Sequence, residues 1–218
     1  MNINFANSRR PPDRNALNDA VMQTQRMMSA LFQPHEDVTL SAREGRRDTI
    51  RKIVPAGQLA DDAARFSLDR WERDFRLLVD VVRAERREVP VGHAPTSSFL
   101  PPDIPVLVVT FPSDTDGIVR ALQSMAVPPN VIVDAAQEVH AAWKLDELIN
   151  RDEHGNLANR IRSTLRAGSS FINKTEIPLP GFSGTGQGGP LGQLVGSVVN
   201  TVRPLKALRA MELPSSKN

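Results

Sequence analysis

One histidine inside an alternating segment is the residue of this chain best placed to carry chemistry. His140 lies in residues 139–145, in which every second side chain is apolar, and a β-branched run at residues 131–133 precedes it. This pattern predicts two short strands joined by a tight connection. The alternation places Trp143 on one face and His140 on the other, so we expect the histidine to be available to solvent or to a ligand. The alternative is an ordinary surface or packed histidine.

Three aspartates are candidates for holding a divalent metal ion. Asp114 and Asp116 are two residues apart, and Asp134 follows the β-branched run. Each also has a simpler explanation. Asp114 and Asp116 stand at the start of an expected helix, where carboxylates cap free backbone N–H groups. Asp134 stands beside an expected turn, which is a common place for aspartate.

Basic residues are concentrated towards the C-terminus. Residues 157–218 carry eight basic and two acidic side chains, whereas residues 1–156 carry 19 basic and 23 acidic ones. Most of the basic side chains are arginines, whose guanidinium group can bind a phosphate with two hydrogen bonds. A cationic C-terminal third predicts nucleic-acid binding. The alternative is an ordinary solvated surface.

The composition is that of a globular protein without cysteine chemistry. Of the 218 residues, 40% are hydrophobic, 24% are charged and none is cysteine. Disulfides, thiolate metal sites and cysteine nucleophiles are therefore excluded. No stretch approaches the roughly 20 apolar residues of a membrane span, and residues 1–14 lack the apolar core of a secretory signal. We therefore expect a soluble, cytoplasmic protein without a membrane partner.

A glycine-rich run at residues 184–189 is reminiscent of a phosphate-binding loop. It lacks the Gly-Lys-Ser/Thr ending and a preceding apolar strand, so a flexible linker is favoured. The chain is accordingly divided into a disordered N-terminus (1–14), an α+β domain (15–179) and a Gly/Pro-rich basic tail (180–218). Residues 191–208 of this tail either pack on the domain or stay mobile.

Apolar periodicity predicts where helices and strands lie within the domain. The sequence predicts helices at residues 16–32, 67–87, 114–125 and 153–166, strands at 37–43, 106–111 and 171–179 besides the hairpin, and a charged turn at 44–52. The second of these helices depends on the stripe formed by Trp71, Phe75, Leu78 and Val82, with Ser67 as its N-cap.

Two segments carry a resemblance to a known family. The first is Pro128-Pro-Asn-Val-Ile-Val-Asp-Ala-Ala-Gln-Glu-Val-His-Ala-Ala-Trp-Lys-Leu-Asp-Glu147, and the second is Arg166-Ala-Gly-Ser-Ser-Phe-Ile-Asn-Lys174. The run from Pro105 to Glu147 resembles the catalytic core of archaeo-eukaryotic-type primases, in particular the RepB-like and bifunctional primase-polymerase domains of plasmids and phages. The second segment is similar to a basic strand that this family often shows. The resemblance implies an α+β fold with an antiparallel or mixed sheet and packed helices.

The resemblance also implies roles for individual residues. His140 matches the family's nucleotide-contacting histidine, and Arg166 and Lys174 would line a phosphate-facing groove. DNA or RNA is the implied partner, and a replication helicase is a further candidate. As isolated basic residues, Arg166 and Lys174 also fit a solvated surface.

The departures from the family pattern concern its chemistry. Val108 and Thr110 stand where the two metal-binding aspartates are expected, and neither can hold two metal ions for nucleotidyl transfer. The family's Ser-Gly-x-Gly turn is Ala135-Ala-Gln-Glu138 here. Both glycines are therefore replaced by residues whose side chains lie where, in the family, the backbone approaches the nucleotide.

Three hypotheses for function follow. The first is a replication-related primase-like domain that binds nucleic acid or nucleotide through His140, Arg166 and Lys174 but has lost metal-dependent chemistry. The second is an active nucleotidyltransferase that uses Mg²⁺ or Mn²⁺ on displaced carboxylates such as Asp114, Asp116 or Asp134. The third is a structural or interaction protein of a mobile genetic element, which keeps the fold only as a scaffold.

Overall fold

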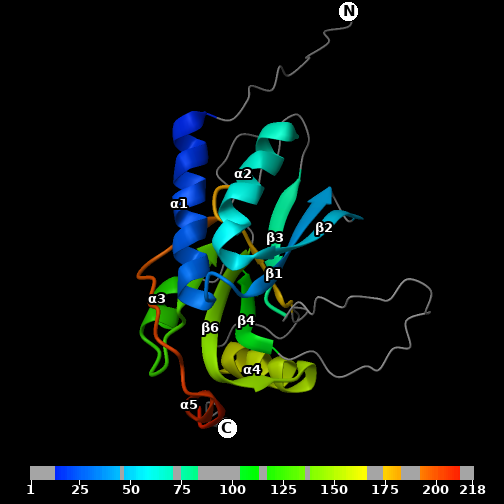
Figure 1. Ribbon diagram of the computed structural model, residues 1–218. Helices are drawn as coiled ribbons and strands as arrows, with labels where there is room; N and C mark the ends of the chain where they lie inside the picture. Colours follow the sequence, from blue (N-terminus) through cyan, green and yellow to red (C-terminus); the bar gives the residue numbers. More distant parts are fainter. Residues whose placement is uncertain are drawn as a thin grey trace, which may run out of the picture.

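The chain folds into two antiparallel four-stranded sheets with helices packed on them (Figure 1). The computed structural model describes residues 13–44, 47–70, 75–82, 104–112, 117–135, 138–165, 174–182 and 192–211. The first sheet contains, in spatial order, β2 (Arg47–Pro55), β1 (Asp37–Glu44), β3 (Arg76–Asp80) and β7 (Glu176–Pro178). The second contains β4 (Ile104–Pro112), β6 (Glu138–Ile149), β5 (Val131–Asp134) and β8 (Gln193–Leu194). The predicted α+β class is confirmed.

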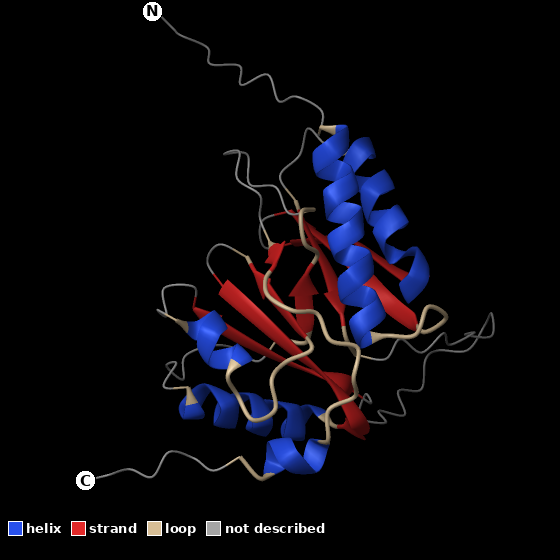
Figure 2. Ribbon diagram, turned by 90° about the vertical axis from the view of Figure 1, so that its left-hand side faces the viewer, coloured by secondary structure: helices blue, strands red, loops and turns tan. Residues whose placement is uncertain are grey.

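Two long helices lie side by side next to the first sheet, as Figure 2 shows. They are α1 (Arg14–Leu31) and α2 (Leu59–Asp69), and the short 3-10 turn η1 (Ala56–Gln58) precedes α2. The predicted helix at residues 16–32 is confirmed as α1, which buries Met27, Met28 and Leu31 at helical spacing. Among the described helices, none has the length and apolar character needed to cross a bilayer.

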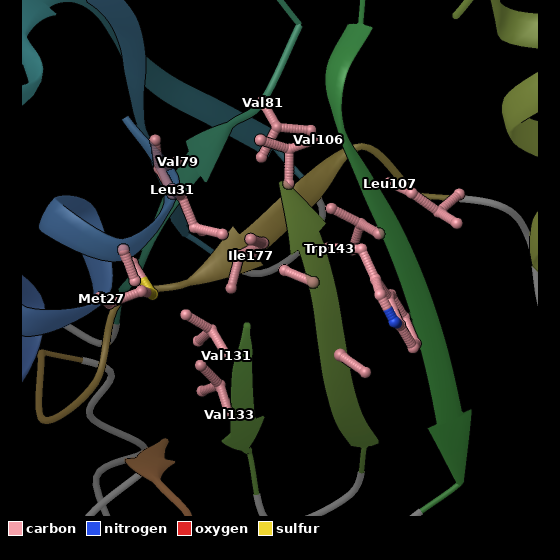
Figure 3. Close-up of a cluster of buried hydrophobic side chains, with 14 of the residues drawn as sticks. Met27, Leu31, Val79, Val81, Val106, Leu107, Val131, Val133, Trp143 and Ile177 are labelled. Carbon is pink, nitrogen blue, oxygen red and sulfur yellow. The ribbon is translucent and has the colours of Figure 1, made fainter. Parts of the chain in front are cut away.

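Helix α1 joins the two sheets into one core. Figure 3 shows Met27 and Leu31 of α1 beside apolar side chains of both sheets, such as Val79 and Ile177 of the first and Val131 of the second. The side-chain oxygen of Gln23 also accepts a hydrogen bond of 2.9 Å from the Leu194 N–H on β8. Because the apolar stripe of the helix is buried against strands of both sheets, neither sheet has a separate core.

The predicted helix at residues 67–87 is wrong. Helix α2 ends at Asp69, and Arg76–Asp80 forms strand β3 between β1 and β7. In a short apolar run, periodicity alone does not distinguish a helix from a buried strand. Here the pairing of this segment with β1 on one edge and with β7 on the other makes it a strand. Ser67 is a buried residue of the last turn of α2 rather than an N-cap. Trp71 and residues 83–87 lie outside the described part of the chain.

The charged stretch at residues 44–52 is mostly a strand rather than a turn. Strand β2 starts at Arg47 and pairs with β1 along its whole length, with a register shift between Ala42 and Arg43. It is the outer strand of its sheet, and charged side chains such as Arg51 and Lys52 are frequent on edge strands because they discourage pairing with other chains. The composition resembles that of a turn for this reason.

The predicted hairpin and the buried strand before it are confirmed as β5–β6 and β4. Trp143 on β6 is fully buried, and its indole N–H donates to the Val127 carbonyl at 2.9 Å. Two further helices lie within a few residues of their predicted positions. They are α3 (Ile118–Gln123), which begins later than expected after Gly117 at φ 74°, and α4 (Arg151–Thr164).

The described C-terminal segment, residues 192–211, packs on the second sheet. Strand β8 pairs with β5, and helix α5 (Leu205–Arg209) buries Leu205 and Leu208. The side-chain amide of the fully buried Asn130 donates to the carbonyls of Val199 and Thr201, both at 2.7 Å. Its oxygen accepts from the Lys144 N–H at 2.8 Å. One buried side chain therefore holds both this segment and β6.

Candidate functional site

The candidate site lies on one face of the second sheet, near the C-terminal end of β4 and the N-terminal end of β6. Residues directly opposite each other in an antiparallel pair share a face. His140 is opposite Thr110 on β4 and Val133 on β5, and Ala142 is opposite Val108. The two positions that the resemblance assigns to metal-binding aspartates therefore lie on the same face as the histidine.

His140 is buried, and the expectation that it is open to solvent is wrong. Only 3% of its surface is exposed. The alternation correctly separated Trp143 from His140, but this second face is also covered, because it lies against the core shared with α1 and the first sheet (Figure 3). Burial lowers the pKa of His140, so the imidazole is neutral at neutral pH.

A threonine and a glutamate flank the histidine ring. The Thr110 hydroxyl lies 3.3 Å from His140 Nδ1, and a Glu138 carboxylate oxygen lies 3.3 Å from Nε2. The contact with Glu138 is electrostatic in character, because Nε2 has no partner in aligned hydrogen-bond geometry among the described residues. The carboxylate favours the tautomer with the proton on Nε2, and Nδ1 is then free to accept from Thr110.

Glu138 also binds Lys174, which is 36 residues away in the sequence. The Lys174 Nζ atom donates to both carboxylate oxygens, at 2.6 and 2.7 Å. Together, His140 and Lys174 lower the pKa of Glu138 to about 2, against the opposite effect of burial. The carboxylate is therefore charged at every physiological pH, and it neutralises the lysine that the sequence assigned to phosphate binding.

Further ion pairs lie on one face of the neighbouring sheet. Arg43 binds Glu176 at 2.7 Å, and Arg51 binds Asp80 at 3.1 Å. In each pair the arginine is the more exposed partner, with 34% and 64% of its side chain accessible against 16% and 10% for the carboxylate. Arg76 is directly opposite Arg43 and is close enough to contribute to lowering the pKa of His140. On this face, arginines therefore form the more exposed half of each ion pair, and Arg76 is the one that acts on His140.

The cationic C-terminal third is partly buried and partly ion-paired within the protein. Arg162 is buried on α4, and its guanidinium donates to the Asn159 side chain at 2.9 Å. Arg209 pairs with Glu153 at 2.6 Å and lies 3.6 Å from a Glu147 oxygen. The count of basic residues in the sequence therefore overstates the charge that this region offers to an anion.

Among the other predicted site residues, only Asp134 lies in the described part of the chain, and it is not brought to His140. Arg166, Asp114 and Asp116 lie outside the described residues. Asp134 is opposite Val139, and therefore lies on the face of the sheet that points away from His140. Within the described ranges, no three His, Asp or Glu side chains are grouped as a metal site requires.

Positions 108 and 110 do not fit a pair of metal ions. Val108 has no donor atom for a metal, and the single hydroxyl of Thr110 is within hydrogen-bond distance of His140. Divalent ions such as Mg²⁺ bind through carboxylates. Positions 108 and 110 therefore supply no carboxylate for a metal ion.

Two contacts of the site were not predictable from the sequence. Glu138 was recognised as the replacement of a glycine, but no local pattern links it to Lys174. Thr110 was recognised as the replacement of an aspartate, and its contact with His140 depends on the pairing register of β4 with β6. Both contacts follow from tertiary structure, because Thr110 comes from another strand than His140, and Lys174 comes from the segment before β7.

Comparisons with solved structures identify the fold. The catalytic domain of primase RepB′ in complex with initiator DNA superposes with a TM-score of 0.61 at 13% identity, covering 85% of this chain and 88% of that one. A structure of primase RepB′ gives 0.60 at 12%, covering 84% of this chain and 58% of that one. The AEP domain of the primase-polymerase of cyanophage S-2L gives 0.53 at 12%, covering 94% and 100%. No family model and no curated protein matches the sequence. The chain has an archaeo-eukaryotic primase-like fold.

Proposed function

We propose that this protein is a replication-related, primase-like domain that binds nucleic acid or nucleotide and does not transfer nucleotides. The observation that supports this most directly is the identity of two residues on β4, Val108 and Thr110. They lie on the same face of the sheet as His140, at positions where nucleotidyl transfer by two metal ions requires carboxylates. The fold without these ligands is suited to binding alone.

Nucleic-acid binding is supported by arginines of the first sheet. Arg43 and Arg51 are each at least one-third exposed although each pairs with a carboxylate, and the exposed Arg76 lies opposite Arg43. Arg166 is assigned to the same role. A primase of the same fold has been crystallised with initiator DNA. On this proposal the protein acts in the cytoplasm on a plasmid- or phage-type replicon, with a replication helicase as a candidate partner.

The first test is a titration of labelled single-stranded DNA into the full chain at 50 and 200 mM salt. Contacts with about three phosphates predict that affinity falls about 20-fold across this range, because bound counterions are released. The same reactions, with Mn²⁺ and labelled nucleotide added, are expected to give no incorporation.

The other outcomes separate the remaining hypotheses. Incorporation that disappears in Asp114→Ala or Asp134→Ala would refute the proposal in favour of an active nucleotidyltransferase with displaced carboxylates. Absence of both binding and incorporation would favour a structural protein of a mobile element. RNA of the same length, tested in parallel, identifies which nucleic acid is preferred.

A further inference from the structure

Glu138 sits where an anionic ligand would have to bind. Lys174 and His140 are the positive and hydrogen-bonding groups at this point, and the Glu138 carboxylate is in contact with both of them. Two of the three protons of the lysine ammonium are directed to its oxygens. A charge-assisted contact with both oxygens at 2.6 and 2.7 Å is among the stronger polar contacts available in proteins.

A phosphate group cannot share this position with the carboxylate. An added phosphate would need the same lysine protons, and it would be placed beside a fixed negative charge. Glu138 cannot relieve the repulsion by taking up a proton, because its pKa is about 2. The site is nevertheless reachable from solvent, since 34% of the Lys174 side chain and 22% of the Glu138 side chain are exposed.

From this geometry we infer that Glu138 is a built-in anion that closes the Lys174–His140 site to nucleotide triphosphates, so that the domain binds polynucleotide but not free nucleotide. The inference rests on the proposed function and makes it narrower. Polynucleotide can still bind through exposed arginines of the first sheet, such as Arg51 and Arg76, because many weak phosphate contacts along a strand replace one strong triphosphate site.

The test compares ATP binding to the full chain and to three variants. Glu138→Gln keeps the size of the side chain and removes its charge. Asp62→Asn is the matched control, because Asp62 is also a partly buried carboxylate paired with a lysine, Lys52, at 3.0 Å, and this pair lies on α2 and β2. The third variant combines Glu138→Gln with Lys174→Ala.

We expect no measurable ATP binding for the unmodified protein or for Asp62→Asn. In Glu138→Gln, affinity for ATP should exceed the weakest affinity that the assay detects by at least about tenfold, a factor that corresponds to about 1.4 kcal/mol. The added Lys174→Ala change should abolish the gain. Thermal unfolding of each variant verifies that it is folded, and Glu138→Ala serves in place of Glu138→Gln if the glutamine variant does not fold.

Two results would overturn the inference: ATP binding by the unmodified protein that equals that of Glu138→Gln, or folded Glu138 variants that bind ATP no better than the unmodified protein. Titration of single-stranded DNA into the same proteins separates this failure from failure of the proposed function. If DNA binds and the Glu138 variants gain no affinity for ATP, only the inference fails. If no DNA binds, the proposed function fails, and a gain in ATP affinity would still establish Glu138 as the blocking residue.

Discussion

Lowering the pH from 7 to 5 should destabilise this protein through one buried histidine. His154 on α4 is 2% exposed, and its Nε2 atom accepts a hydrogen bond of 3.2 Å from the Val108 N–H on β4. Strand β4 is at the edge of its sheet, so this N–H has no neighbouring strand to bind. A protonated imidazole has no acceptor atom, and protonation would leave the buried N–H without a partner.

The size of the effect follows from the pKa. Burial first, then Arg162 and Arg151, lower the pKa of His154 from 6.5 to about 4. The unfolded chain therefore takes up a proton below pH 6.5 that the folded protein takes up only near pH 4, and the free energy of unfolding falls across this window. At about 1.4 kcal/mol per pKa unit, the total loss is about 3 kcal/mol, of which about 2 kcal/mol falls between pH 7 and pH 5.

Urea unfolding at pH 7 and pH 5 measures this loss, with His154→Gln as the control. Glutamine can place an acceptor oxygen near the position of Nε2 and does not titrate. The pKa of His140 is also lowered, so it contributes in the same direction, but it is present in both proteins and cancels in the comparison. Glu138, with a pKa of about 2, loses its contribution only below about pH 4.5. Equal losses in the two proteins would refute the reasoning.

Two further predictions concern stability. Asn130→Ala should lower the free energy of unfolding by about 2–4 kcal/mol, because three hydrogen-bonding partners lose the side chain that satisfies them; faster hydrogen exchange in residues 192–211 would locate the effect, and unchanged exchange there would contradict it. Leu77→Ala should cost about 2–5 kcal/mol in chemical unfolding, because Leu77 is fully buried on β3; a loss below about 1 kcal/mol would mean that this position is not in a central strand.

Local sequence patterns predicted those parts of the fold in which the spacing of apolar residues fits only a strand or only a helix. The hairpin was predictable because the β-branched run at residues 131–133 and the alternation around Trp143 both favour strands. Strand β3 was missed because Phe75, Leu78 and Val82 also fit a helical stripe, and only the pairing of β3 with β1 and β7 decides between them. Local propensity is commonly overridden in this way by tertiary pairing.

The sequence was sufficient to select residues of the candidate site, but not to predict their burial or their ion pairing. Sequence comparison with a family pattern selected His140, Lys174, Val108 and Thr110, and the register places three of these on one face. The burial of His140 and the pairing of Lys174 with Glu138 depend on what covers the face and on contacts 36 residues apart. No pattern within a single segment carries that information.

The two borders of the second sheet are closed by segments that follow β4, β5 and β6 in the sequence, and that are therefore synthesised after these strands. Helix α4 covers the β4 side through His154, and the segment held by Asn130 covers the β5 side with the two-residue strand β8. Until residues 193–199 are available to pair with it, β5 has an open hydrogen-bonding edge of the kind that promotes association between chains. We therefore expect nascent or truncated chains ending near residue 190 to aggregate, and the pairing of residues 193–199 with β5 to complete this sheet.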